Sequence, residues 1–265
     1  GSNAPVVKAV VMPLSPDQVT GYHATGVATP IAIASSQEVE YYRNEFDRLE
    51  SEEGVQRAQN RLFDRHFDQP FIWEIASHPA ILESVAALYG EHLLVLSTHV
   101  FCKYGSNDHF VAWHQDLTYW GLEPLEEVTA WYAIDDSDLE NGCMRVIPGR
   151  HPQQLLEHGR SDQAGNLLSV NQAVAVTPED EAQAIDCVLQ AGEISLHEGT
   201  VVHGSLPNRS PRRRCGVAVR YIPAHVRPLG AGPLGTDWKW RPILVRGASQ
   251  HDHFDLVPPP FSASS

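Results

Sequence analysis

The segment Trp113-His114-Gln115-Asp116 determines what the rest of the chain is expected to form. Side chains two residues apart on an extended segment point to the same face, so His114 and Asp116 would lie side by side. An imidazole nitrogen and a carboxylate oxygen on one face can bind a divalent metal from one side. A second His from elsewhere would complete the 2-His-1-carboxylate facial triad, which leaves positions on Fe(II) for substrate and O2.

A His-x-Asp pattern is weak evidence by itself, since it arises by chance and recurs at His253-Phe254-Asp255. The surroundings favour the copy at 114–116, because aromatic residues crowd it, a strand-like run follows at 128–134, and further His residues lie downstream. The copy at 253–255 has no His after it and is crowded by the prolines at 258–260. The tail segment His251-Asp252-His253 is therefore expected to be solvated rather than a second metal site.

Two downstream residues, His197 and His203, compete for the position of the third ligand, since both fall in one strand-turn-strand region. We favour His203, because it precedes Gly204-Ser205, a turn at Pro207-Asn208 and an arginine cluster that opens the next strand. His197 remains the alternative.

The arginine cluster at 212–214 is the one dense basic cluster in the sequence. An arginine on the strand beside the metal would form a bidentate pair with a carboxylate co-substrate. Arg214 is expected to be this buried anchor, with the Ser205 hydroxyl on the same carboxylate. Arg212 and Arg213 are expected on the solvated surface.

Composition limits the classes of function. The net charge of −14 disfavours nucleic acid and anionic membrane surfaces as general partners. No apolar run reaches membrane-spanning length, and the four cysteines form no Cys-x-x-Cys pair, which favours a reduced, cytoplasmic protein. The N-terminus lacks a signal-peptide pattern, and Gly1-Ser2-Asn3-Ala4 is interpreted as an expression-tag remnant.

The first third of the chain has helical periodicity. Ser15-Pro16-Asp17 is typical of a helix start, and that helix is expected to end near Gly26. A strand is expected at 30–34, followed by helices at 36–53 with Ser36 as cap, at 55–66, and at 71–89 with a break at His78-Pro79.

From Leu93 the pattern changes to short β-prone runs separated by Gly and Pro turns. Strands are expected at 93–102, 128–134, 143–147, 185–189, 193–197, 200–203 and 216–222, and the polar region 151–180 as an insertion or lid. The pattern predicts a mainly β fold with a helical N-terminal part, and a double-sheet jelly roll fits it. We expect one domain over 5–265, with a helical part at about 15–90, a jelly-roll core at about 91–225 and a C-terminal tail.

At this level of detail the sequence resembles the phytanoyl-CoA dioxygenase family of Fe(II)/2-oxoglutarate oxygenases, and its bacterial branch more than the peroxisomal enzyme. Four segments carry the resemblance: 113–120 (WHQDLTYW), 129–131 (TAW), 140–149 (ENGCMRVIPG) and 203–210 (HGSLPNRS). The resemblance covers nearly the whole chain from Ser15. One departure is Arg150, where the family usually has Ser.

The resemblance implies a double-stranded β-helix (jelly-roll, cupin-like) core and assigns roles to individual residues. The implied iron ligands are His114, Asp116 and His203. The implied contacts to 2-oxoglutarate are Arg214, Ser205, Trp131 and His99. Residues implied or expected near the substrate are His66, Lys103, Gln115, Tyr119 and Trp120, with a core or surface role as the alternative for His66.

The implied activity is an Fe(II)- and 2-oxoglutarate-dependent hydroxylation of an unactivated C–H bond, using O2 and releasing succinate and CO2. In the halogenating branch of this superfamily a small residue replaces the metal carboxylate, whereas Asp116 is present here. We expect a small-molecule substrate, which the sequence does not identify as a CoA ester, and it does not predict an oligomeric state. Two other classes stay open: a metal-dependent cupin-type enzyme that uses no 2-oxoglutarate, and a non-catalytic β-barrel binding protein.

Overall fold

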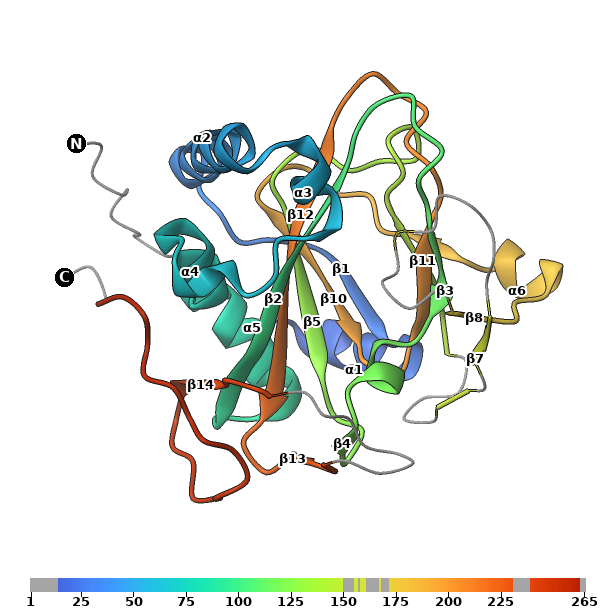
Figure 1. Ribbon diagram of the computed structural model, residues 1–265. Helices are drawn as coiled ribbons and strands as arrows, with labels where there is room; N and C mark the ends of the chain where they lie inside the picture. The colour runs from blue at the N-terminus through green and yellow to red at the C-terminus, as the bar shows by residue number, and fades with distance from the viewer. Residues whose placement is uncertain are drawn as a thin grey trace.

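The computed structural model describes residues 14–149, 155–156, 158–160, 167, 172–230 and 239–262. Helices fill most of its first third (Figure 1). They are α1 (Pro16–Thr25), α2 (Ser36–Glu53), α3 (Val55–Asn60), the short 3-10 helix η1 (Arg65–Phe67), α4 (Pro70–Ala76) and α5 (Pro79–Tyr89). None of the described helices is long and apolar enough to cross a membrane.

Two antiparallel sheets form the rest of the fold. The larger has the order β1 (Val27–Ala32), β10 (Glu193–Glu198), β5 (Val128–Ala133), β12 (Arg214–Pro223), β2 (Leu93–Lys103) and β14 (Ile243–Arg246). The smaller has the order β3 (Val111–His114), β11 (Val202–Ser205), β6 (Met144–Ile147) and β9 (Ile185–Asp186). Short elements complete the described part: η2 (Asp116–Tyr119), β4 (Leu122–Glu123) with β13 (Arg227–Pro228), β7 (His158–Arg160) with β8 (Gln172–Val174), and α6 (Pro178–Ala182). This is the predicted double-stranded β-helix.

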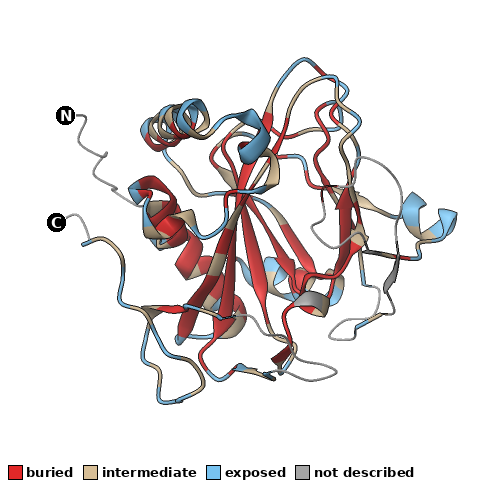
Figure 2. Ribbon diagram, viewed as in Figure 1, coloured by how far each residue is buried: buried red, intermediate tan, exposed pale blue. Residues whose placement is uncertain are grey.

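The larger sheet has two buried faces, as Figure 2 shows along β12, β5 and β10. On β12, Cys215, Val217, Val219 and Tyr221 pack into the main core with Phe46 of α2 and Val85 of α5. Arg214, Ala218 and Arg220 point the other way and line a pocket between the sheets. Because strand side chains alternate with period 2, one strand thus contributes to both the core and the pocket.

Most predicted elements are present, and several boundaries are corrected. The cap of α2 is Ser35, not Ser36, because the Ser35 hydroxyl accepts from Glu38 N and the Glu38 carboxylate accepts from Ser35 N. The helix predicted at 55–66 ends at Asn60, since the following residues pair with β2 through Leu62 O and Val100 N. The first strand is Val27–Ala32 rather than 30–34.

The jelly roll also extends beyond its predicted limits. Two strands of the larger sheet fall outside the expected core at 91–225 in the sequence. The edge strand β1 comes before residue 91, and the edge strand β14 comes after residue 225. The strand predicted at 185–189 is shorter, because only Ile185 and Asp186 pair with β6. Within the predicted insertion, β8 and α6 are described, whereas Arg150 and much of 151–171 lie outside the described residues.

Candidate metal centre and pocket

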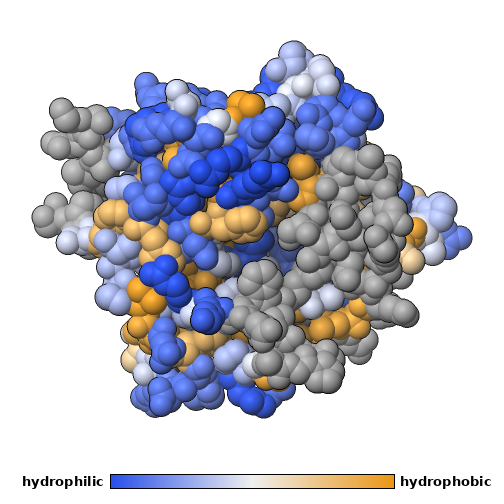
Figure 3. Space-filling model, in the orientation of Figure 1, coloured by the Kyte–Doolittle hydropathy of each residue, from blue (hydrophilic) through white to orange (hydrophobic). Residues whose placement is uncertain are grey.

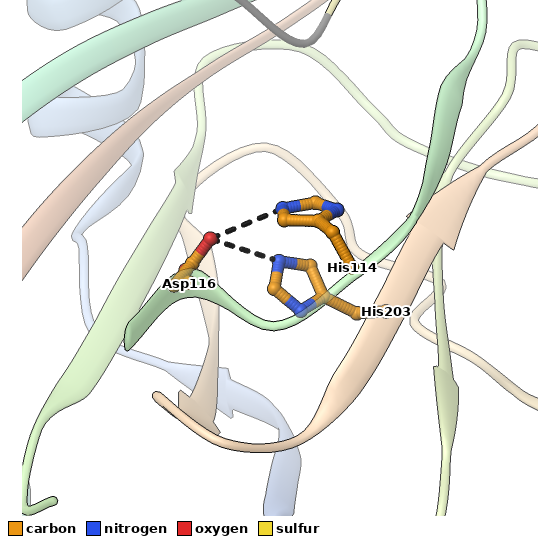
Figure 4. A group of neighbouring side chains, drawn as sticks. All are labelled: His114, Asp116 and His203. Atoms are coloured by element: carbon orange, nitrogen blue, oxygen red, sulfur yellow. Dashed lines mark hydrogen bonds and ion pairs between the residues drawn. The ribbon is translucent and has the colours of Figure 1, made fainter. Parts of the chain in front are cut away.

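His114, Asp116 and His203 meet between the two sheets (Figure 4). His114 ends β3 and stands directly opposite His203 of β11 in the strand register, while Asp116 begins η2. Asp116 Oδ1 lies 3.1 Å from His114 Nε2 and 3.5 Å from His203 Nε2. All three side chains are buried, and one ligand atom from each lies within 4.8 Å of the others.

The hydrogen bonds of the two His rings indicate which ring nitrogen carries the proton. In both rings the Nε2 atom is the one that faces Asp116. His114 Nδ1 lies 2.8 Å from Ala112 O, and His203 Nδ1 lies 3.0 Å from Val201 O. A backbone carbonyl only accepts, so each Nδ1 carries the proton, and in the neutral ring the lone pair lies on Nε2. Two such lone pairs and a carboxylate oxygen would repel one another, and a divalent cation between them removes that repulsion. The donor set therefore fits a 2-His-1-carboxylate metal site.

The protonation states agree with this geometry. Although burial alone would raise it, the neighbouring His203, His114 and His197 hold the pKa of Asp116 well below its usual range. Burial and the proximity of His114 hold the pKa of His203 well below its usual value. Asp116 is thus a carboxylate and His203 a neutral imidazole at neutral pH, which are the forms that bind a metal.

His197 is the alternative ligand that the sequence left open, and it lies beside the triad. Its Nε2 is 3.4 Å from Asp116 Oδ2, the oxygen that faces away from His114 and His203. Its Nδ1 is buried without a hydrogen-bond partner. His197 is therefore a partner of the Asp116 carboxylate. His203 is the second His of the three-residue group with metal-ligand geometry.

A pocket beside the triad holds about 460 Å³ of empty space, part of which is open to solvent. Apolar side chains, among them Phe101, Val111 and Met144, form part of its wall. Polar groups on the wall include Ser205, Thr129 and the two arginines of β12.

Arg214 lies at one end of this pocket and is buried. Its Nη1 donates to Gly142 O at 2.7 Å, and its guanidinium carbon is 5.0 Å from the centre of the Trp131 ring. Its Nε has no hydrogen-bond partner. Lys103 lies behind Ser205, and its Nζ donates to Ser205 Oγ at 2.5 Å and to Gly142 O at 3.1 Å. Lys103 thus orients Ser205 without lining the pocket.

Two other expected pocket residues, His99 and His66, are not among the lining residues, although His99 stands opposite the lining residue Ala218 in the strand register. His99 Nε2 bonds Asn60 O at 2.8 Å, its ring stacks on Phe63, and burial with Arg220 nearby lowers its pKa to about 3. His66 is buried with its Nδ1 2.8 Å from Thr98 Oγ1, as its alternative core role requires.

Gln115 and Trp120 contact other parts of the protein and are not among the pocket-lining residues. The Gln115 amide donates to Thr200 O at 2.6 Å and accepts from Leu156 N at 2.6 Å. Trp120 packs in a small core cluster with Leu117 and Ile222. Tyr119 ends η2, and its side chain lies outside the described part.

One arginine lies elsewhere than predicted, and a second pocket arginine was not predicted. Arg213, expected on the surface, is mostly buried between α2 and the sheet, where it pairs with Asp47, Glu50 and Asp135. Arg212 is exposed and pairs with Asp138. Arg220 lines the pocket and was not singled out, although alternation from Arg214 through 216 and 218 places it on the same face.

The tail match does not form a comparable group. His251 and His253 stack with their ring centres 5.0 Å apart, but among the described residues the triad is the one group with metal-ligand geometry.

Comparisons with known proteins give a consistent result. The sequence model of the phytanoyl-CoA dioxygenase (PhyH) family matches residues 14–216. A phytanoyl-CoA dioxygenase domain-containing protein 1 homolog of Dictyostelium discoideum is 32% identical over 41% of this chain. The peroxisomal phytanoyl-CoA dioxygenase of Bos taurus is 22% identical over 80% of it. The matches span 39% and 69% of these two relatives.

Solved structures agree with the fold. The non-heme monooxygenase ThoJ in its apo form is 29% identical, with a TM-score of 0.75 over 92% of this chain and 87% of that protein. CytC3 with Fe(II) and alpha-ketoglutarate is 24% identical, with a TM-score of 0.67 over 92% of this chain and 93% of that protein, a likeness that concerns the fold.

Proposed function

Because this chain belongs to the phytanoyl-CoA dioxygenase family, we propose that it is an Fe(II)- and 2-oxoglutarate-dependent oxygenase that hydroxylates an unactivated C–H bond of a small organic molecule. The observation that carries the proposal is the His114–Asp116–His203 group with the buried, incompletely bonded Arg214 in the same pocket. The single-domain organisation and the cytoplasmic location expected from the sequence stay predictions.

In this proposal His114, Asp116 and His203 hold the iron by one side and leave its other positions to ligands from the pocket. When bound, iron and 2-oxoglutarate together supply the oxidising power of the reaction, using O2 and yielding succinate and CO2. The chain's own part is to hold three ligands in a fixed geometry and to keep water from the reacting groups. The neutral His203 and the ionised Asp116 are ready to bind the metal at neutral pH.

Arg214 is the proposed partner of the far carboxylate of 2-oxoglutarate. A guanidinium stays charged in a protein, so a buried one with a free Nε favours an anion in the adjoining space. The Ser205 hydroxyl, held by Lys103, lies on the same pocket wall and would donate a second hydrogen bond. Trp131 stacks on the guanidinium and fixes its plane.

Two features support hydroxylation as the outcome. Asp116 would supply the third protein ligand to the metal, so a halide would have to displace a buried carboxylate. The apolar wall formed by Phe101, Val111 and Met144 suits an organic substrate that presents a C–H bond.

Anaerobic titration with Fe(II) and then 2-oxoglutarate, followed by visible absorption, tests the proposal. A 2-oxoglutarate chelate on the triad iron gives a weak charge-transfer band, which we expect in the wild type and not in Asp116→Ala. Arg214→Ala should require more 2-oxoglutarate to reach the same band, whereas Arg246→Ala, on the remote strand β14, should not. Iron binding without a band would favour a metal enzyme that uses no 2-oxoglutarate. Failure to bind iron would favour a binding protein.

A further inference from the structure

Arg220 is the second buried arginine of the pocket, and the proposed function does not use it. Among the described arginines only Arg214 and Arg220 are buried, with 2% and 8% of their surface exposed. Both line the pocket, and neither forms an ion pair within the described part of the chain. Less buried arginines such as Arg65, Arg145 and Arg213 each pair with carboxylates. The chain has 33 acidic residues against 19 basic ones, so the unpaired state of Arg220 does not follow from a lack of acids.

The position of Arg220 is fixed by its neighbours. Its guanidinium carbon lies 5.0 Å from the centre of the Trp120 ring, which is itself held in a core cluster. Its Nε is buried without a hydrogen-bond partner. Stacking on Trp120 fixes the plane of the guanidinium, and its Nε–H can still donate a hydrogen bond. A planar anion that enters the pocket can therefore align with this plane.

Nearby acids do not neutralise it. Glu127 and Asp64 lie within its electrostatic reach, but neither forms an ion pair with it. Thr129 Oγ1 donates to Glu127 Oε1 at 2.7 Å, and Asp64 Oδ1 accepts from Thr98 N at 3.1 Å. Burial, with Asp116 nearby, raises the pKa of Glu127 well above its usual value, and burial raises that of Asp64. The positive charge of Arg220 is therefore left for the pocket.

The strand register places Arg220 next to the metal centre. Arg220 pairs with Thr129 of β5, which pairs with His197 of β10, and all three line the pocket. His197 contacts Asp116, so this row of side chains ends at a proposed metal ligand. Arg214 lies six residues away on the same face of β12, about 20 Å along an extended strand. Between them, the Trp131 ring covers Gly216, and Ala218 lines the pocket.

We infer that Arg220 binds a carboxylate or phosphate group of the molecule to be oxidised, so that the substrate is a small oxyanion anchored at the opposite end of the pocket from 2-oxoglutarate. This inference rests on the proposed function, because Arg214 is assigned to the co-substrate. Bidentate contact with the planar guanidinium would hold the oxyanion beside the metal and present an adjacent C–H bond to it. The net charge of −14 steers anions away in general, whereas this internal cation selects them locally.

The test uses the full chain with Mn(II) in place of Fe(II), saturating 2-oxoglutarate, and trifluoroacetate as the oxyanion probe. Bound Mn(II) accelerates the 19F relaxation of a probe held near it, so the readout is independent of turnover. We expect saturable binding in the wild type and a loss of affinity of about tenfold or more in Arg220→Met. Arg246→Met, which removes a surface arginine, should bind the probe as the wild type does.

Two outcomes would overturn the inference. One is probe binding that is the same in Arg220→Met as in the wild type. The other is a wild type that binds no probe. If the 2-oxoglutarate affinity of Arg220→Met then falls as far as that of Arg214→Met, the anion at Arg220 is the co-substrate's own. Arg220→Lys, which keeps the charge but loses the planar fork, should lie between wild type and Arg220→Met and serves if the Met variant does not fold. Failure of the proposed function is seen separately, as absence of the 2-oxoglutarate chelate band.

Discussion

The indole of Trp131 lies directly against the backbone of Gly216. A Cβ placed on Gly216 would be 2.1 Å from Cζ2 of that ring, closer than real contacts allow. Gly216 stands two residues from Arg214 on the same face of β12, and Trp131 stacks on Arg214. The missing side chain at 216 therefore allows the ring to lie flat over the strand and hold the guanidinium.

Gly216→Ala is expected to displace Trp131 and to weaken the hold on Arg214. Overpacking in a closed core costs about 1–3 kcal/mol of unfolding free energy, and 2-oxoglutarate binding should weaken with it. Urea unfolding and a 2-oxoglutarate titration measure the two effects. Gly21→Ala in α1, where the added Cβ meets nothing within 4 Å, is the control and should leave 2-oxoglutarate binding unchanged. Wild-type affinity in Gly216→Ala would contradict the role given to this contact.

His197→Phe is expected to lower metal affinity by about 10- to 100-fold, because Asp116 loses the partner of its second oxygen. Anaerobic calorimetric titration with Fe(II) measures the change. His66→Phe is the matched control, since His66 is equally buried but bonds Thr98 and lies off the pocket wall. Equal losses in both variants would show that the effect comes from general destabilisation.

Lys103→Met is expected to destabilise the fold and to weaken 2-oxoglutarate binding moderately. The substitution removes this donor from Leu206 O, leaves Gly142 O with Arg214 Nη1 as its donor, and frees the Ser205 hydroxyl to rotate. An acceptor left unsatisfied costs about 1–3 kcal/mol, to be measured by urea unfolding. Ser205→Ala separates the effects: it should reproduce the binding loss with little loss of stability. Full stability in Lys103→Met would refute this account of the buried amine.

A buried pair, Glu38 of α2 and His78 at the start of α5, is expected to make stability depend on acid pH. His78 Nε2 lies 2.8 Å from Glu38 Oε2. Although burial raises it, the hydrogen bonds from His78 and Ser35 leave the pKa of Glu38 below its ordinary value of 4.5. A depressed folded-state pKa stabilises the fold above the unfolded-state pKa, and this contribution is lost as the pH falls below about 4.5 through the folded-state value.

Urea unfolding at neutral pH and at about pH 4 tests this dependence. Glu38→Gln should be less stable than the wild type at neutral pH by about 1–3 kcal/mol and should lose less on acidification. Glu40→Gln, on the exposed side of the same helix, should follow the wild type at both values. Parallel pH profiles for Glu38→Gln and wild type would contradict the assignment.

The sequence predicted what local patterns encode. Ser15-Pro16 starts α1, the break at His78-Pro79 separates α4 from α5, and the strands from Leu93 onward follow from their β-branched and apolar runs. The triad was predicted because His114 and Asp116 are two residues apart, and the Gly-Ser and arginine pattern after His203 distinguished it from His197.

What escaped prediction depends on contacts between distant segments. Arg213 is buried because α2 brings Asp47 and Glu50 over it, and no feature of residues 212–214 encodes that. His99 points to Asn60 and Phe63 because the segment after α3 pairs with β2. Alternation from Arg214 could have placed Arg220 on the pocket face of β12, but its charge gives no local sign of burial.

The two edge strands of the larger sheet come from opposite ends of the chain, and this has a consequence for producing the protein as fragments. The family match ends at residue 216, inside β12, whereas β14 covers the free side of β2 much later in the chain. A fragment cut at the end of that match would lose most of β12 and leave β2 and β5 with unpaired backbone groups, which recruit strands from other molecules. We expect such a fragment to aggregate. The stretch that the family model matches is thus shorter than the stretch that must be made together for the larger sheet to be complete.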